Sequence, residues 1–311
     1  MIAIALTIAP IFLLIMTGYA FKRTGFFGDD FWRSAERLSY YVLLPVLIVR
    51  NLGGADLSNV DLGAFAVVLL LLATAMGLLI LALKPLLPMG GAAYTSVFQG
   101  AVRLNSYVGF AVSEAVFGTE GLVIASLFVG IMIPTVNVIA IIVMSFVVPA
   151  EGRPGWRNVP REIARNPIIL ACLLGGLINM VSLPLPGWLL ETMSILAGAA
   201  LPIALLCVGA GLMLTFDGAR AFGLGLACVL KLVAMPIIAA PIALYFGLNS
   251  LAFAIVMLFS ATPASPASYV LARQLGGDAP LMAAILSMQT LLSAIAVPVV
   301  VYWAKSRMGL P

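Results

Sequence analysis

The sequence contains no histidine and few charged residues. Only 9% of its 311 residues are charged and 63% are hydrophobic, whereas a soluble domain carries about 25% charged residues. Without histidine, a Ser-His-Asp triad, a helix-borne zinc protease motif and histidine metal sites are excluded. A G-x-S-x-G elbow and a P-loop are also missing. The composition therefore predicts a protein that lies in lipid and disfavours a membrane protease or acyltransferase.

Cysteine is scarce as well. Cys172, Cys207 and Cys228 each lie in an apolar run, which is typical of small packing residues. Their spacing indicates neither a disulfide framework nor a zinc site, so we expect no metal and no cofactor. The net charge of +4 comes from basic residues in short loops. Membrane orientation explains such residues better than nucleic-acid binding does.

Ten apolar segments approach the length of about 20 residues that crosses a bilayer. The first lacks a basic n-region and a small-residue cleavage site, so we expect a retained helix rather than a signal peptide. The sequence thus predicts an all-α membrane protein with ten transmembrane helices. The segments cover about 2–21, 33–53, 62–83, 92–117, 121–148, 164–182, 188–213, 221–246, 250–275 and 279–303.

Lysine and arginine are unevenly distributed over the connections. The odd-numbered connections carry eleven of them, and the opposite side carries Arg50, Lys305 and Arg307. Because cytoplasmic loops hold the excess of basic residues, the central linker 149–163 is predicted to be cytoplasmic. Both termini are then predicted to lie on the outer side.

A shift of 157 residues aligns several prolines and glycines of the two halves. The segments 1–148 and 164–311 would each hold five helices, so the second half enters the membrane from the opposite side. Such inverted repeats are typical of secondary transporters. The aligned pairs are Pro10 with Pro167, Gly18 with Gly175, Pro45 with Pro202, and Gly54 with Gly211.

Two of the predicted helices contain candidate breaks. Pro263 and Pro266 interrupt helix 9, and an interior proline costs about 3 kcal/mol. Ser265 before Pro266 resembles an N-cap and first-turn pair. The equivalent place in helix 4 has no proline, but Asn105 or Ser106 can cap a half-helix there. Paired breaks indicate a binding site; the alternative is a proline kink in helix 9 and a continuous helix 4.

Three charged residues fall inside predicted spans, where a charge costs roughly 2.5–3.5 kcal/mol. Arg103 suits a substrate carboxylate, and Glu114 would exchange protons if transport is coupled to H⁺. Alternatively, Arg103, Glu114 and Lys231 only balance charges. Uncharged polar residues in the spans line a cavity or bond between helices: Tyr40, Tyr41, Asn51, Gln99, Asn137, Gln289 and Thr290.

Several segments have a distinctive order and spacing: Ala9-Pro10-Ile11-Phe12, Leu38-Ser39-Tyr40-Tyr41-Val42-Leu43-Leu44-Pro45 and Arg103-x-Asn105-x-Tyr107-x-Gly109. The last two predicted helices add Pro263, Ser265 and Asp278. Together these segments resemble the auxin efflux carrier family over nearly the whole chain.

This resemblance implies two inverted five-helix repeats that cross at broken helices 4 and 9, with Asn105 as the crossover residue of helix 4. It also implies a homodimer in the bacterial inner membrane. Plant relatives export auxin, and bacterial relatives are described as malonate or malate carriers. The chain departs from the plant pattern because helix 4 lacks a crossover proline and helix 9 has Thr262 and Ser265 but no asparagine.

The leading prediction is therefore a secondary transporter of a small organic anion, with H⁺ or Na⁺ as a possible coupling ion. A cation/proton antiporter is the alternative, and it requires a pair of buried carboxylates at the crossing. Glu114 and Lys231 are predicted to serve coupling or charge balance. The predicted substrate-binding residues are Arg103, Asn105, Ser106, Thr262, Pro263, Ser265, Pro266 and Tyr41.

Overall fold

The computed structural model describes residues 1–147, 161, 164–214, 218–274 and 276–310. All regular elements within these ranges are helices. Six helical stretches are long and apolar enough to cross a membrane, as expected for a multi-pass membrane protein. They are Ile2–Arg23, Leu62–Leu86, Gly91–Ala140, Gly187–Ala210, Gly218–Tyr245 and Ala279–Met308.

The first half of the chain contains two irregular helices. The second predicted span is one continuous path through α2, the π-helical turn η1 and α3. The fourth and fifth predicted spans become a short helix, α5, followed by the long α6, which bends at Gly118 (φ 63°). The elements are α1 (Ile2–Arg23), α2 (Asp29–Leu38), η1 (Ser39–Leu43), α3 (Leu44–Gly53), α4 (Leu62–Leu83), η2 (Lys84–Leu86), α5 (Gly91–Val102) and α6 (Ser106–Val147).

The second half contains a matching short helix, α12, and a second π-helical turn, η6. Helix α8 begins at Pro167 rather than at residue 164, because the Asn166 side chain caps it by accepting from the N–H groups of Ile168 and Ile169. The elements are α8 (Pro167–Met180), α9 (Gly187–Ala210), η5 (Gly218–Arg220), α10 (Ala221–Val229), η6 (Leu230–Ala234), α11 (Met235–Tyr245), α12 (Ser250–Ser260), α13 (Ala267–Gln274) and α14 (Ala279–Met308).

Two helix pairs pack through glycine at close range. A Cβ on Gly18 of α1 would lie 2.0 Å from the carbonyl oxygen of Leu206 in α9. A Cβ on Gly175 of α8 would lie 3.2 Å from the Cα of Val49 in α3. Small residues let membrane helices approach closely. Glycine at these two positions therefore fixes how α1 meets α9 and how α8 meets α3.

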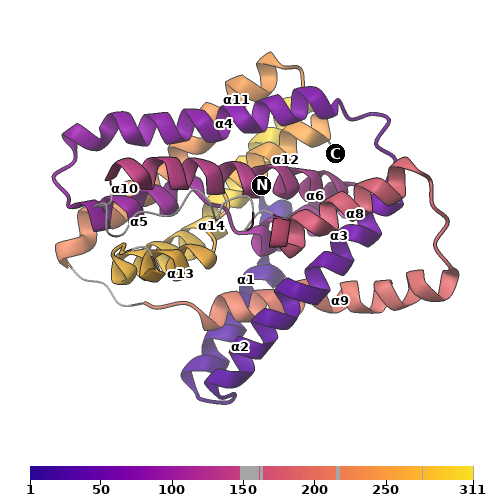
Figure 1. The fold of residues 1–311 in the computed structure, drawn as a ribbon, viewed down its shortest axis with the longest axis horizontal. Helices are drawn as coiled ribbons and strands as arrows, with labels where there is room; N and C mark the ends of the chain where they lie inside the picture. Colours follow the sequence, from indigo (N-terminus) through magenta and orange to yellow (C-terminus); the bar gives the residue numbers. More distant parts are fainter. Residues whose placement is uncertain (148–160, 162–163, 215–217, 275, 311) are drawn as a thin grey trace.

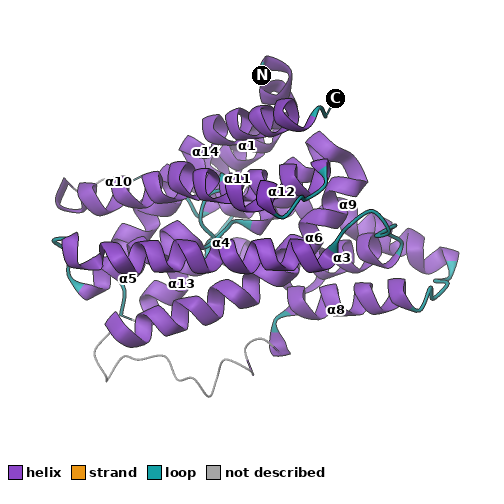
Figure 2. Ribbon diagram, turned by 90° about the horizontal axis from the view of Figure 1, so that it is seen from above, coloured by secondary structure: helices purple, strands orange, loops and turns teal. Residues whose placement is uncertain are grey.

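The four helices next to the breaks form two groups. Helix α5 contacts α13, and α12 contacts α6. Figures 1 and 2 both place α5 and α13 together, to the left of α12 and α6. Each broken helix thus runs from one group to the other.

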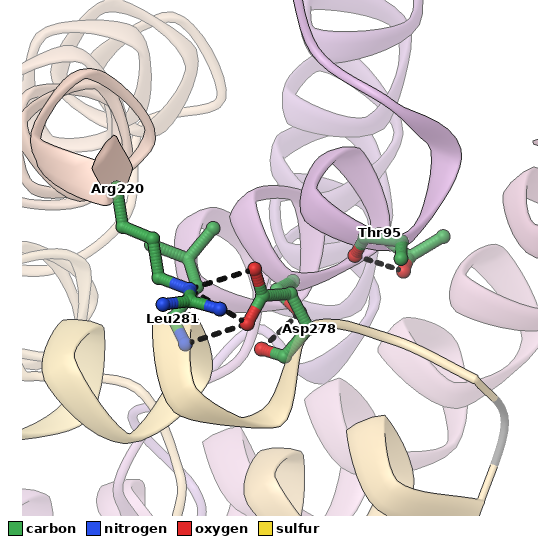
Figure 3. A network of polar contacts seen from close by, with 6 residues as sticks. Thr95, Arg220, Asp278 and Leu281 are labelled. Atoms are coloured by element: carbon green, nitrogen blue, oxygen red, sulfur yellow. Dashed lines mark hydrogen bonds and ion pairs between the residues drawn. The ribbon is translucent and has the colours of Figure 1, made fainter. Parts of the chain in front are cut away.

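A network of hydrogen bonds centred on Asp278 lies where α5, η5 and the start of α14 meet (Figure 3). Asp278 caps α14 by accepting from the N–H of Leu281 at 3.0 Å, and it accepts from Nε of Arg220 at 2.9 and 3.1 Å. Its own N–H donates to the carbonyl of Ala92 at 3.1 Å, and its carbonyl accepts from Ser96 Oγ at 3.0 Å. The network ties the start of α14 to α5 and η5.

Candidate functional site

The two helix breaks touch each other. The first break is residues 103–105, between α5 and α6, and the second is residues 261–266, between α12 and α13. The backbone N–H of Asn105 donates to the carbonyl oxygen of Pro263 at 2.8 Å. Both residues are buried. Irregular backbone is tolerated at membrane depth only where protein or a water-filled cavity surrounds it, and here each break is covered by the other.

Asn105 ends the first break by capping α6. Its Oδ1 accepts from the N–H groups of Tyr107 at 3.0 Å and Val108 at 3.3 Å, which are orphan donors of the first helical turn. Helix 4 is therefore discontinuous, as the capping pattern predicted, and the continuous alternative is wrong. Close by, a Cβ on Gly109 would lie 2.2 Å from the ring of Phe259, so glycine allows α12 to approach α6.

The second break also uses local caps. Thr262 Oγ1 donates to the carbonyl of Phe259 at 2.8 Å, at the end of α12. Ser265 Oγ accepts from the N–H of Ala267 at 3.3 Å, where α13 begins. The prediction of a second half-helix that starts beside Ser265 and Pro266 is therefore confirmed.

The side chain of Gln289 joins three backbone segments at the breaks. It is fully buried (0% exposed). Its Oε1 accepts from the N–H of Ala264 at 2.9 Å, and its Nε2 donates to the carbonyls of Gly100 at 2.9 Å and Ala227 at 3.0 Å. Gly100 lies in the last turn of α5, where carbonyls lack helical partners, and Ala227 lies just before η6. One amide from α14 thus connects α5, α10 and the second break.

Arg103 lies in the first break but is engaged by the protein. Its Nη2 donates to Oδ1 of Asn137 at 2.8 Å, from the part of α6 beyond the bend at Gly118. Ser106 is half-buried at the start of α6. The expectation that Arg103 lies beside the crossing is met, while at least one of its N–H groups bonds to an amide side chain.

Two predicted residues lie in the π-helical turns. Tyr41 is 60% exposed in η1, with its ring edge-on to that of Tyr40. Lys231 lies in η6 and is 0% exposed, and its Nζ lies 3.1 Å from Sδ of Met235. None of the ion pairs between described residues includes Lys231.

A cavity of about 350 Å³ lies between α1, α3, α6 and α9. Its ionisable lining residues are Arg50 in the last turn of α3 and Glu114 in α6, and Ser194 of α9 adds a hydroxyl. The rest of the lining is apolar, with leucines such as Leu47 and Leu201. Of the predicted site residues this cavity includes Glu114 alone. Sequence reasoning missed Arg50 because an arginine near the end of a span resembles an ordinary interfacial charge.

One face of α6 runs from the breaks to this cavity. Tyr107 and Ala111 are four residues apart, and Glu114 and Ala115 follow at the next turn, so all four share one side of the helix. At the break end, the N–H of Tyr107 donates to Oδ1 of Asn105 at 3.0 Å. At the other end, Ala111, Glu114 and Ala115 line the cavity. The face therefore joins the two candidate regions.

Comparison with known proteins indicates the kind of protein in which the two touching helix breaks and the cavity occur. Residues 156–301 match the family described as "Membrane transport protein". An uncharacterized transporter of Methanothermobacter thermautotrophicus is 26% identical over 297 residues, which cover 94% of this chain and 95% of the relative. The chain is thus similar to membrane transport proteins in its second half, and to this relative over almost its whole length. The match agrees with the resemblance to auxin efflux carriers and supports a role in membrane transport.

Proposed function

We propose that this protein is a secondary active transporter of a small organic anion. The substrate would be a dicarboxylate such as malonate or malate, or an auxin-like monocarboxylate. The observation that carries the proposal is the bond between Asn105 and Pro263, which brings two interrupted helices together. In transporters, the ends of such helices form substrate and ion sites.

The charge pattern at the breaks favours an anion. Helices α6 and α13 both begin there, and a helix N-terminus carries a partial positive charge. Arg103 adds a full positive charge at the same place. We propose that the break residues bind the substrate: Arg103, Asn105, Ser106, Thr262, Pro263, Ser265 and Pro266. Tyr41 would contribute only from the exposed surface of η1.

We further propose that the two halves, 1–148 and 164–311, are inverted repeats that exchange conformations during alternating access. The glycine contacts support this. The shift of 157 residues that relates Gly18 to Gly175 also relates Val49 to Leu206, and the two contacts pair these same positions. The predicted linker 149–163 falls outside the described residues except for residue 161. A cytoplasmic linker, outer termini, an inner-membrane location and a homodimer remain part of this proposal.

Uptake into proteoliposomes tests the site. Asn105→Ala removes a helix cap at the breaks, and Asn249→Ala removes the equivalent cap of α12, where Asn249 Oδ1 accepts from the N–H of Ala252 at 2.8 Å. We expect uptake of radiolabelled malonate, malate or indole-3-acetate to be lost in Asn105→Ala and kept in Asn249→Ala. Equal uptake by both variants and the wild type would rule out the breaks as the site.

A cation/proton antiporter remains the alternative. The two breaks contain no aspartate or glutamate, so the carboxylate pair that such a mechanism requires is missing there. Cation-dependent proton flux in the same vesicles, without uptake of any organic anion, would favour this alternative.

A further inference from the structure

Arg50 and Glu114 face one cavity from opposite helices without neutralising each other. Both line the space between α1, α3, α6 and α9. Among the ion pairs of the described residues, none joins these two side chains. The guanidinium of Arg50 makes one long contact, from Nη1 to Oδ1 of Asn51 at 3.5 Å, which is at the limit of a hydrogen bond. Both charges are thus available to a ligand.

The net charge of the cavity determines which ions can bind in it together. An arginine stays protonated in proteins, so the walls are neutral only when Glu114 is ionised. A carboxylate bound to Arg50 would then leave one excess negative charge between apolar walls inside the membrane. Glu114 is exposed and Arg50 is half-buried, and an uncompensated charge at membrane depth is unfavourable. A single proton on Glu114 restores neutrality, and no other carboxylate lines the cavity.

We propose that Arg50 binds the carboxylate of a transported monocarboxylate and that Glu114 carries one proton with it, so the loaded cavity has no net charge. This inference rests on the proposed function. The proton comes from water in the cavity and adds to a carboxylate oxygen of Glu114. It returns to water when the anion leaves on the other side, and no other bond forms or breaks. The cycle is an electroneutral symport of one anion charge with one proton.

Few charged side chains lie on the helices that pack around Glu114. Helix α1 contributes apolar lining residues to the cavity, and its charges, Lys22 and Arg23, lie at its far end. Helices α4, α5, α8 and α12, which also pack on α6, carry no Asp, Glu, Lys or Arg. The remaining groups are Arg50 on α3, Glu191 on α9, Glu120 on α6 itself, and Lys305 on α14, which lies 5.7 Å from the ring centre of Phe117.

Proteoliposomes that hold the full chain test the coupling. Labelled malonate, malate and indole-3-acetate are offered under a pH gradient, acid outside, or under a potassium–valinomycin potential without a pH gradient. For the wild type we expect the pH gradient to drive at least tenfold accumulation of indole-3-acetate and the potential alone to drive none. Malonate and malate carry a second negative charge, so their uptake with one proton would still respond to the potential. In Glu114→Gln, where the side chain stays neutral, the pH gradient should fail and an inside-positive potential should drive uptake instead.

Matched variants separate the two charges. Glu120→Gln removes an exposed carboxylate beyond the bend of the same helix and should leave the coupling unchanged. Arg50→Gln should raise KM at least tenfold at a similar maximal rate, and Arg50→Lys should recover part of this loss.

The outcomes distinguish this inference from the proposed function. Anion uptake by the wild type that follows the potential and ignores the pH gradient would overturn the proton on Glu114 but leave the anion carrier intact. Uptake of a zwitterionic apolar amino acid in place of anions would also overturn it, because Glu114 would then bind an ammonium group. Failure of the wild type to take up any organic acid would instead refute the proposed function.

Discussion

The N–H of Asn105 donates to the carbonyl of Pro263 at 2.8 Å, and this single bond joins the breaks of two helices from opposite halves of the chain. The same asparagine caps α6 through its side chain. The backbone N–H of Asn105 thus joins the two breaks, and its side chain caps the start of α6. A substitution of Asn105 that keeps the helix cap but changes the charge can therefore test substrate binding separately from folding.

Asn105→Asp keeps an oxygen that accepts the two N–H groups of α6, but it adds a negative charge. Because aspartate caps helices as well as asparagine does, we expect the melting temperature to stay within a few degrees of the wild type. Organic-anion uptake should fall by at least tenfold through repulsion of the substrate. Thermal unfolding in detergent and uptake in vesicles measure both effects. Normal uptake by Asn105→Asp would show that no anion approaches this residue.

Gln289→Leu should destabilise the protein, whereas Gln99→Leu should not. The first change removes three hydrogen bonds, each worth about 0.5–1.5 kcal/mol net, and leaves buried backbone groups unpaired. The side chain of Gln99 is also buried, but neither of its polar atoms has a hydrogen-bond partner among the described residues. Thermal unfolding of the two variants compares them directly. Equal melting temperatures would mean that the Gln289 bonds contribute nothing.

Gln289→Glu adds a pH test of the same residue. A protonated carboxyl can still donate one bond and accept another, but an ionised one repels the carbonyls of Gly100 and Ala227. The uptake of this variant relative to the wild type should therefore be higher at pH 5 than at pH 7.5. A ratio that does not change with pH would argue that Gln289 does not position the breaks.

Gly209→Ala should disrupt the contact of α1 with α9. A Cβ there would lie 1.7 Å from the carbonyl oxygen of Ile15, which is far inside van der Waals contact. Gly176 of α8 has open space around it, and alanine in a helix is favoured over glycine by roughly 0.5–1 kcal/mol. We expect Gly176→Ala to express and unfold like the wild type or better, and Gly209→Ala to lose folded protein. Size-exclusion profiles and melting curves check this; a well-folded Gly209→Ala would contradict the packing of α1 on α9.

Arg220→Gln should loosen the end of the molecule where α5, η5 and α14 meet. The pair with Asp278 is partly shielded from solvent, with side-chain exposures of 35% and 19%, so a loss of about 1 kcal/mol is expected. Amide exchange at the start of α14 should rise in the variant and remain unchanged for α12. Unaltered exchange at both places would show that the network in Figure 3 does not hold this end together.

The local features of the fold were predictable from the sequence. Ten spans were predicted from the apolar runs, and the structure shows six helical stretches within the described residues that are long and apolar enough to cross a membrane. The second break follows from Pro263, Ser265 and Pro266. The cap at Asn105 was also predictable, because it depends on residues within one turn. The predicted start at about residue 164 lies within one turn of the observed start of α8 at Pro167, which the cap of Asn166 sets.

The long-range features were not predictable. Gln289 was expected only as one polar residue among several, because its three partners come from segments that are distant in sequence. Arg50 was counted as a loop charge, and only packing places it in a cavity with Glu114. Nothing in the apolar pattern indicated the π-helical turns η1 and η6, since one extra residue per turn leaves composition unchanged.

Counterflow measures the central claim most directly. Proteoliposomes are loaded with unlabelled malonate, malate or indole-3-acetate and diluted into a trace of the labelled compound. An alternating-access carrier should accumulate the label transiently above its outside concentration, and Asn105→Ala should abolish the overshoot while Asn249→Ala retains it. Monotonic equilibration without an overshoot for all three compounds in the wild type would contradict the account of an organic-anion carrier built on the meeting of the two breaks.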